Sequence, residues 1–250
     1  MKNNHKIIAF LTSLFLLNSP ALATPGTDFD FYRADNDPTD FHTTTYGNGL
    51  TGNDAAAFQE FVHTEASALD LSTIQARKLD PNQLKINKTK EISVYFIKEE
   101  TAGRNQILVS SSGSSIFNGS VFDDVICFAD GCNRGDELIT PPAVDPDNVL
   151  ELSDYVNLGT VLSDSQLDFS ITDGTYTFSA NPSLNPDGIQ HVMAYEYEGY
   201  LILTFEDHIN GGDFDYNDLV IAVNIGQDNL DCIPTDGEAF DPNCGIVFAD

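Results

Sequence analysis

Short segments in which hydrophobic and polar residues alternate set the strongest constraint on the fold of this chain. Within residues 91–97, Ile92, Val94 and Phe96 share one face of an extended chain and the residues between them share the other. A period of two is typical of β-strands. Clusters of Gly, Pro, Asn and Asp separate further segments of this kind and indicate turns. These further predicted strands are Gln106–Ser110, Ser120–Cys127, Gly159–Leu162, Leu167–Ile171, Thr175–Ser179, His191–Tyr197, Tyr200–Glu206 and Asp218–Ile225. The pattern favours an all-β fold, an antiparallel β-sandwich or jelly roll.

The start of the chain has the pattern of an export signal. Residues 1–23 begin with two lysines, continue with the apolar run Ile7–Leu17 and close with Ala21 and Ala23, where signal peptidase reads small residues. The apolar run is shorter than the roughly 20 residues that a membrane-spanning helix needs. We expect a cleaved signal peptide and a mature chain that is secreted or periplasmic, with no integral membrane segment.

The remaining chain divides by composition into three parts. Residues 24–84 are interpreted as an N-terminal extension, in which Asp54 can cap a short helix over Ala55–Leu69. Residues 85–226 hold the alternating segments and form the predicted β-sandwich. Residues 227–250 form a tail that a disulfide is expected to staple.

All four cysteines follow the predicted signal. In an exported chain an even number of cysteines is usually paired, and adjacent pairing is the simplest arrangement. It joins Cys127 to Cys132 and Cys232 to Cys244. Zinc is the alternative, but neither spacing is C-x-x-C and no His lies between the partners.

The charge balance is strongly acidic. The chain has 39 Asp and Glu against 11 Lys and Arg, which gives a formal net charge of −28. Such a chain repels phosphate backbones, so we expect no nucleic-acid partner. The simplest interpretation of the charge is that it keeps an exported chain dispersed.

One segment concentrates the residue types that bind a hard cation. The predicted strands Tyr200–Glu206 and Asp218–Ile225 flank residues 207–217, a longer connection than the usual two to five residues of a hairpin. Converging carboxylates repel each other by about 1 kcal/mol per pair in water, and several-fold more when partly buried. Because a divalent cation with oxygen ligands would offset this repulsion, we expect calcium here. The candidate ligands are Glu206, Asp207, Asp213, Asp215, Asn217 and Asp218.

One alternative is excluded for this segment and another stays open. The spacing of its first ligands resembles the opening of an EF-hand loop, but Asp218 replaces the turn Gly and Asn224 stands at position twelve, so it is not an EF-hand. A solvated acidic loop that binds nothing is the simplest alternative.

Other polar residues are interpreted as structural or solvated. We expect His208 to be a surface residue and His191, on an apolar strand, to be structural. Asp123-Asp124 and the Asp28–Asp40 stretch are weaker ion candidates that we expect to be solvated.

The runs ISVYFIKEETAGRNQILV, LGTVL, NPDGIQHVMAY and LILTFEDHINGGDFDYNDLVIAV resemble a family of bacterial exported domains catalogued as domain of unknown function 4114. The resemblance covers roughly Glu91 to Ile225, and its most specific part is F-E-D…D-x-D-Y-N-D. It implies an all-β domain of secreted and surface-associated bacterial proteins, including large adhesin-like ones. It strengthens the expectation of calcium at the six candidate ligands and implies no activity.

Three functions are compatible with these features. The leading one is an exported calcium-binding module for adhesion, matrix or envelope contacts, with a cell-surface, matrix or glycan partner. The second is a hydrolase that uses Glu206 and a hairpin Asp on polysaccharide, but the chain has no Trp for a sugar platform and no recognisable catalytic motif, so we expect no enzyme. The third is glycan recognition through the same calcium ion.

Overall fold

The computed structural model describes residues 29–32, 76–99, 105–125, 154–235, 237–241 and 244. The predicted signal peptide, the predicted helix over Ala55–Leu69 and the Cys127–Cys132 pair lie outside these residues.

The described strands are β1 (Asp30–Tyr32), β2 (Arg77–Leu79), β3 (Lys85–Ile86), β4 (Lys90–Glu99), β5 (Asn105–Gly113), β6 (Phe117–Val125), β7 (Tyr155–Val161), β8 (Ser165–Thr172), β9 (Thr177–Ser179), β10 (Val192–Tyr197), β11 (Tyr200–Phe205) and β12 (Leu219–Asn224). The short helices are η2 (Pro81–Gln83), η4 (Pro182–Leu184), η5 (Ile209–Gly211) and α3 (Gln227–Leu230).

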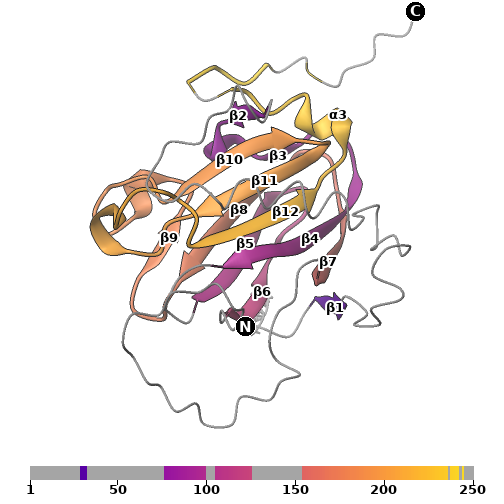
Figure 1. Cartoon of the computed structure of the whole chain (residues 1–250). Coiled ribbons are helices and arrows are strands. Elements are labelled where there is room, and N and C mark those ends of the chain that lie inside the picture. Colours follow the sequence, from indigo (N-terminus) through magenta and orange to yellow (C-terminus); the bar gives the residue numbers. More distant parts are fainter. Residues whose placement is uncertain are drawn as a thin grey trace, which may run out of the picture.

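The strands form two antiparallel sheets. The seven-stranded sheet has the order β1-β7-β4-β12-β11-β10-β2, and the five-stranded sheet consists of β3-β8-β5-β6 with β9 beside β8. Figure 1 shows β10, β11 and β12 side by side in front of β8 and β5. The predicted all-β class is confirmed, while the jelly-roll topology stays a prediction. Among the described residues, α3 is the one α-helix, and it follows the last strand.

The main hydrophobic core contains side chains from both sheets. Val94, Phe96 and Ile221 of the larger sheet belong to the same buried cluster as Ile107 and Phe169 of the smaller one. The predicted face formed by alternate residues of β4 therefore points into this core. Burial of this apolar surface is the main stabilising contribution to the fold.

The opposite face of the seven-stranded sheet is also buried. Tyr95 and Ile97 alternate with the core residues of β4, and they belong to a second apolar cluster with Ile202, Val220 and Ala222. Both faces of the central strands are thus covered. This explains why β11 and β12 read as nearly continuous apolar runs.

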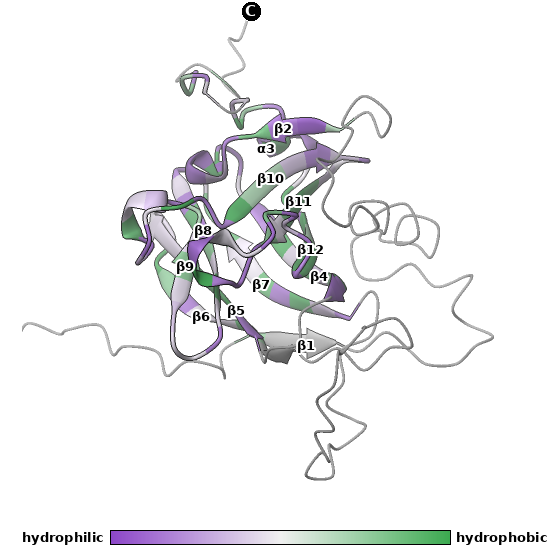
Figure 2. Cartoon of the chain, turned by 60° about the vertical axis from the view of Figure 1, so that its left-hand side comes forward, coloured by the Kyte–Doolittle hydropathy of each residue, from purple (hydrophilic) through white to green (hydrophobic). Residues whose placement is uncertain are grey.

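Chain segments far apart in sequence meet at the β2 edge of this sheet. Figure 2 shows β2 in purple, since two of its three residues are basic. Arg77 donates from its guanidinium to the carbonyls of Ile233 at 2.9 Å and Leu230 at 2.8 Å, and to Oε2 of Glu196 at 2.7 Å. On the far side of β2, Leu79 forms an isolated bridge with Thr235. The sheet therefore includes β2, which belongs to the predicted N-terminal extension, and residues 230–235 near the C-terminus contact this strand.

The tail is cross-linked as expected. Cys232 and Cys244 form a disulfide with Cα atoms 5.4 Å apart. This confirms one of the two predicted pairs. Within the described part of the chain, no helix has both the length and the apolar character to cross a membrane.

Candidate metal centre

The acidic segment connects two buried central strands at one end of the seven-stranded sheet. Phe205 at the end of β11 pairs with Leu219 at the start of β12. Glu206 and Asp218, the next residues outward, therefore leave the sheet close together. The backbone N–H of Asp207 donates to Oδ2 of Asp218 at 2.8 Å and closes the base of the loop. Two rigid strands thus fix both ends of the segment.

Five of the six candidate ligands come together in two overlapping sets. The loop set consists of Glu206, Asp213 and Asp215, and one carboxylate oxygen from each lies within 4.8 Å of the other two. The strand-end set consists of Glu206, Asp207 and Asp218, with oxygens within the same limit. Glu206 belongs to both sets and joins them.

Glu206 is buried at this junction. Its exposed fraction is 1%, and its Oε2 has no hydrogen-bond partner; Oδ1 of Asp207 is also buried and unpartnered. A buried carboxylate oxygen without a partner is costly unless a positive charge compensates it. In the part of the chain that the structure describes, no Lys or Arg forms an ion pair with Glu206, Asp207 or Asp218. These charges therefore lack a compensating side chain there.

An amide from the other sheet reaches the strand-end set. Asn105, the first residue of β5, is 1% exposed and donates from Nδ2 to Oδ2 of Asp207 at 2.7 Å. Its own Oδ1 is buried without a partner. A neutral oxygen of this kind is a common calcium ligand.

The loop backbone takes a conformation that most residues avoid. Asn210, Phe214 and Tyr216 have φ values of +68°, +62° and +57°, and Gly211 and Gly212 are left-handed as well. Each non-glycine residue in this region costs about 1 kcal/mol. These positive φ values allow the chain to turn sharply at Gly211 and Gly212.

Gly212 is required for a second reason. A Cβ built on this residue would lie 2.3 Å from Oε1 of Glu206. Only a glycine therefore lets the loop approach the central carboxylate so closely.

The electrostatics of the sets follow from burial and mutual repulsion. Burial, and then the charge of Asp207, raise the pKa of Asp218 to about 9. Burial also raises the pKa of Glu206, with added repulsion from Asp213 and Asp207, although hydrogen bonds oppose the shift. Without a cation, both carboxyls therefore hold protons at a higher pH than exposed acids do.

The comparison with protein families matches this part of the chain. Residues 157–226 match the family model described as Domain of unknown function (DUF4114). They run from within β7 to the residue before α3. This segment is a DUF4114 domain. No curated protein and no solved structure matched the chain. The predicted resemblance is thereby confirmed for the segment that contains both acidic sets.

Three of the remaining residues considered from the sequence lie within the DUF4114 segment. Asn217 is buried, with its Nδ2 unpartnered, and its backbone N–H donates to Oδ1 of Asp215 at 3.1 Å. His208 is exposed and belongs to neither set. His191 is fully buried within a hydrogen-bonded network. Of the weaker acidic candidates, Asp123 and Asp124 fall within β6, but their side chains lie outside the described part of the structure.

Sequence reasoning missed two polar residues that support the loop. Asn105 precedes the DUF4114 segment, and no local pattern links it to an aspartate 102 positions later. Asp187 lies outside the acidic loop, between β9 and β10. Its Oδ2 accepts from the backbone N–H of Asn210 at 2.6 Å and so anchors the left-handed stretch.

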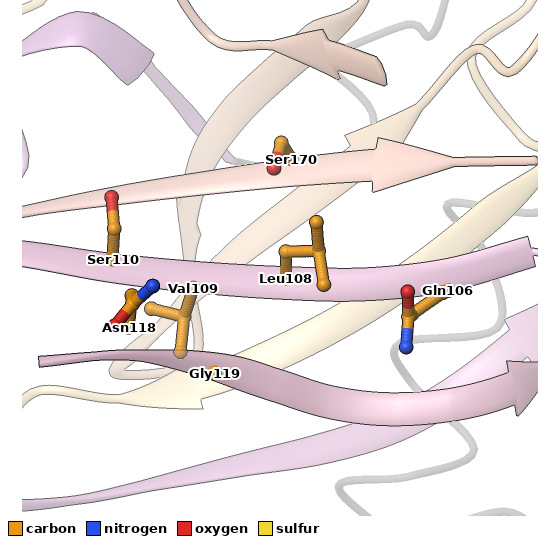
Figure 3. A pocket seen from close by; sticks show the side chains of 7 residues that line it. All are labelled: Gln106, Leu108, Val109, Ser110, Asn118, Gly119 and Ser170. Carbon is orange, nitrogen blue, oxygen red and sulfur yellow. The ribbon is translucent and has the colours of Figure 1, made fainter. Parts of the chain in front are cut away.

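A separate pocket of about 290 Å³ lies on the five-stranded sheet. Figure 3 shows its lining on β5, β6 and β8. The lining residues are Gln106, Leu108, Val109, Ser110, Asn118, Gly119 and Ser170. None of them is acidic and none belongs to either set, so this pocket offers no support for a carboxylate-dependent hydrolase.

Proposed function

We propose that this chain is an exported calcium-binding β-sandwich module that serves adhesion, matrix or envelope contacts. The observation that carries the proposal is the burial of Glu206 with an unpartnered oxygen, within reach of four further carboxylates. The signal-like N-terminus, the disulfide and the DUF4114 match support an exported setting.

The donor set fits calcium better than softer metals. Both sets offer only oxygens, which hard cations prefer, and no His or Cys among the described residues joins them. Calcium–oxygen distances of about 2.3–2.6 Å place opposite ligands about 5 Å apart. Oxygens that lie within 4.8 Å of one another can therefore surround one calcium ion.

The cation would act on structure by holding a strained, negatively charged loop on its sheet. Its ligands come from the end of one strand, the start of the next and the loop between them. An ion bound there would neutralise the repulsion and offset the left-handed backbone. The loop surface, including the exposed Phe214, would then be presented in one shape to a cell-surface, matrix or glycan partner.

The test is thermal unfolding of the mature chain with calcium and with chelator. Extracellular calcium modules bind at about 10⁻⁴ to 10⁻³ M. At a tenfold excess over the dissociation constant, one ion adds about 1.4 kcal/mol, which corresponds to a Tm increase of about 4 °C. The Glu206→Gln variant should lose this increase, and the exposed Glu198→Gln control should keep it. Coincident wild-type curves would rule the site out.

A further inference from the structure

We propose that the acidic segment binds two calcium ions, one in the loop set and one in the strand-end set, with Glu206 as the ligand shared between them. This inference rests on the proposed function and specifies its stoichiometry. It assigns each carboxylate of the segment to one ion or, for Glu206, to both.

The geometry separates the carboxylates into two groups rather than one. Oxygens of Asp213 and Asp215 lie within 4.8 Å of an oxygen of Glu206, and oxygens of Asp207 and Asp218 do so in a second set. Glu206 is the one residue common to both groups. A carboxylate has two oxygens and can bind two cations, which makes it the usual bridge in sites with a pair of metals.

The surroundings of Glu206 place it between loop and sheet. Its Oε1 faces the loop, where a Cβ on Gly212 would collide with it, and its Oε2 is buried without a hydrogen-bond partner. The side chain is 1% exposed, so this oxygen has almost no access to bulk solvent. The buried carboxylate of Glu206 is therefore close to the other carboxylates of both sets.

The strand-end set has its own unpartnered oxygens. Oδ1 of Asp207 and Oδ1 of Asn105 are both buried without hydrogen-bond partners, and the two side chains contact each other through Nδ2 of Asn105. An ion bound only in the loop set would leave these oxygens uncompensated. They are therefore an independent indication of a ligand on the sheet side of Glu206.

The charge count agrees with two ions. Five carboxylates carry five negative charges when ionised, and one calcium ion would leave three of them uncompensated at contact distance. Close pairs of like charges repel one another more strongly where burial reduces the screening by water. A second ion reduces the excess to a single charge.

The experiment counts the ions bound by the mature chain. Equilibrium dialysis against millimolar calcium, in 150 mM NaCl to screen diffuse binding, is followed by elemental analysis. We expect two ions per chain. One ion would overturn this inference and leave the proposed function intact, and no bound ion would overturn both.

Two double variants assign the ions. Asp213→Asn with Asp215→Asn removes two ligands of the loop set, and Asp207→Asn with Asp218→Asn removes two of the strand-end set. Each should retain one ion, whereas Glu206→Gln should weaken both by at least tenfold. Circular dichroism checks that each variant is folded. If either folded double variant retains both ions or loses both, the two-site assignment is wrong.

Discussion

Nε2 of His191 lies 3.1 Å from Oδ2 of Asp187, and both side chains are buried beneath the acidic loop. Nδ1 of the same ring lies 2.8 Å from the backbone carbonyl of Glu206. Both ring nitrogens therefore face hydrogen-bond acceptors, a backbone carbonyl and a carboxylate. The ring also stacks on Phe178 with centroids 3.8 Å apart. The ring thus connects the backbone of Glu206 to Phe178 of the core.

Replacing Asp187 by Asn should weaken this connection. The carboxylate accepts from the backbone N–H groups of Ile189 and Asn210 and from His191, and an amide cannot serve all three. We expect Asp187→Asn to lower the free energy of unfolding at pH 7 by about 2 kcal/mol in urea titrations. The exposed Asp164→Asn is the control and should change it by less than about 0.5 kcal/mol.

The effect of Asp187 should depend on pH in a defined direction. Burial tends to raise its pKa, but hydrogen bonds from the Asn210 and Ile189 backbones and from His191 outweigh it, so the pKa is lowered. A lowered pKa stabilises the fold above the unfolded value of about 3.9, and this contribution disappears as pH falls through the native value. The difference between wild type and Asp187→Asn should therefore shrink towards pH 2. An undiminished difference would contradict this assignment.

Asp218 should produce the opposite pH dependence in the calcium-free protein. Its native pKa is about 9, because of burial and then of the charge on Asp207, whereas the unfolded value is about 3.9. Between these values the folded chain holds a proton that the unfolded chain has released. Stability with chelator should therefore fall as pH rises from 5 to 9, and Asp218→Asn should lack this component. Tm values at pH 5, 7 and 9 test the difference between the two proteins.

Calcium affinity should rise over the same pH range. Bound carboxylates are ionised, so binding displaces the proton that Asp218 retains. Titration calorimetry in two buffers of different ionisation enthalpy should detect proton release at pH 7. Binding without proton release would show that Asp218 is not a ligand.

Gly212→Ala tests whether the close approach of loop and ligand matters. The added methyl would displace Oε1 of Glu206, so we expect calcium affinity to fall at least tenfold. Gly174→Ala is the matched control, since Gly174 also has a left-handed φ, +82°, but a Cβ there meets no atom within 4 Å. Both variants should lose about 1 kcal/mol of stability from backbone strain. Equal affinities in calorimetry would show that the glycine serves only the turn.

The disulfide should stabilise the fold without affecting the ion. Cys232 and Cys244 are 12 residues apart, and closing such a loop contributes about 3 kcal/mol. The double variant Cys232→Ala/Cys244→Ala should therefore melt roughly 6–12 °C lower. Because Cys232 follows the opposite end of β12 from Asp218, the calcium-induced rise in Tm should be unchanged. A variant that loses this rise would indicate that the two ends are coupled.

The features that could be predicted from the sequence are those that depend on a local pattern of residues. Alternation located the long strands, and the clustering of the acidic residues could be predicted because one hairpin brings them together within 13 residues of chain, Glu206 to Asp218. β2 and β3 were missed, because three residues and two residues are too short to show a period. Their assignment depends on distant partners, such as Ala194 opposite Leu79. Asn105 was missed for the same reason, since only the folded chain places it beside Asp207.

The bridge between Leu79 and Thr235 covers β2, the strand at one edge of the larger sheet. The backbone N–H of Asp80 also donates to the carbonyl of Pro234 at 2.9 Å, so residues 234–235 occupy polar groups on the outer side of β2. An uncovered strand of this kind is a template for pairing with a neighbouring molecule. Proteolytic removal of the last 20 residues would therefore do more than destabilise the fold. It would expose the polar backbone groups of β2, and copies of the chain could polymerise by pairing along this edge.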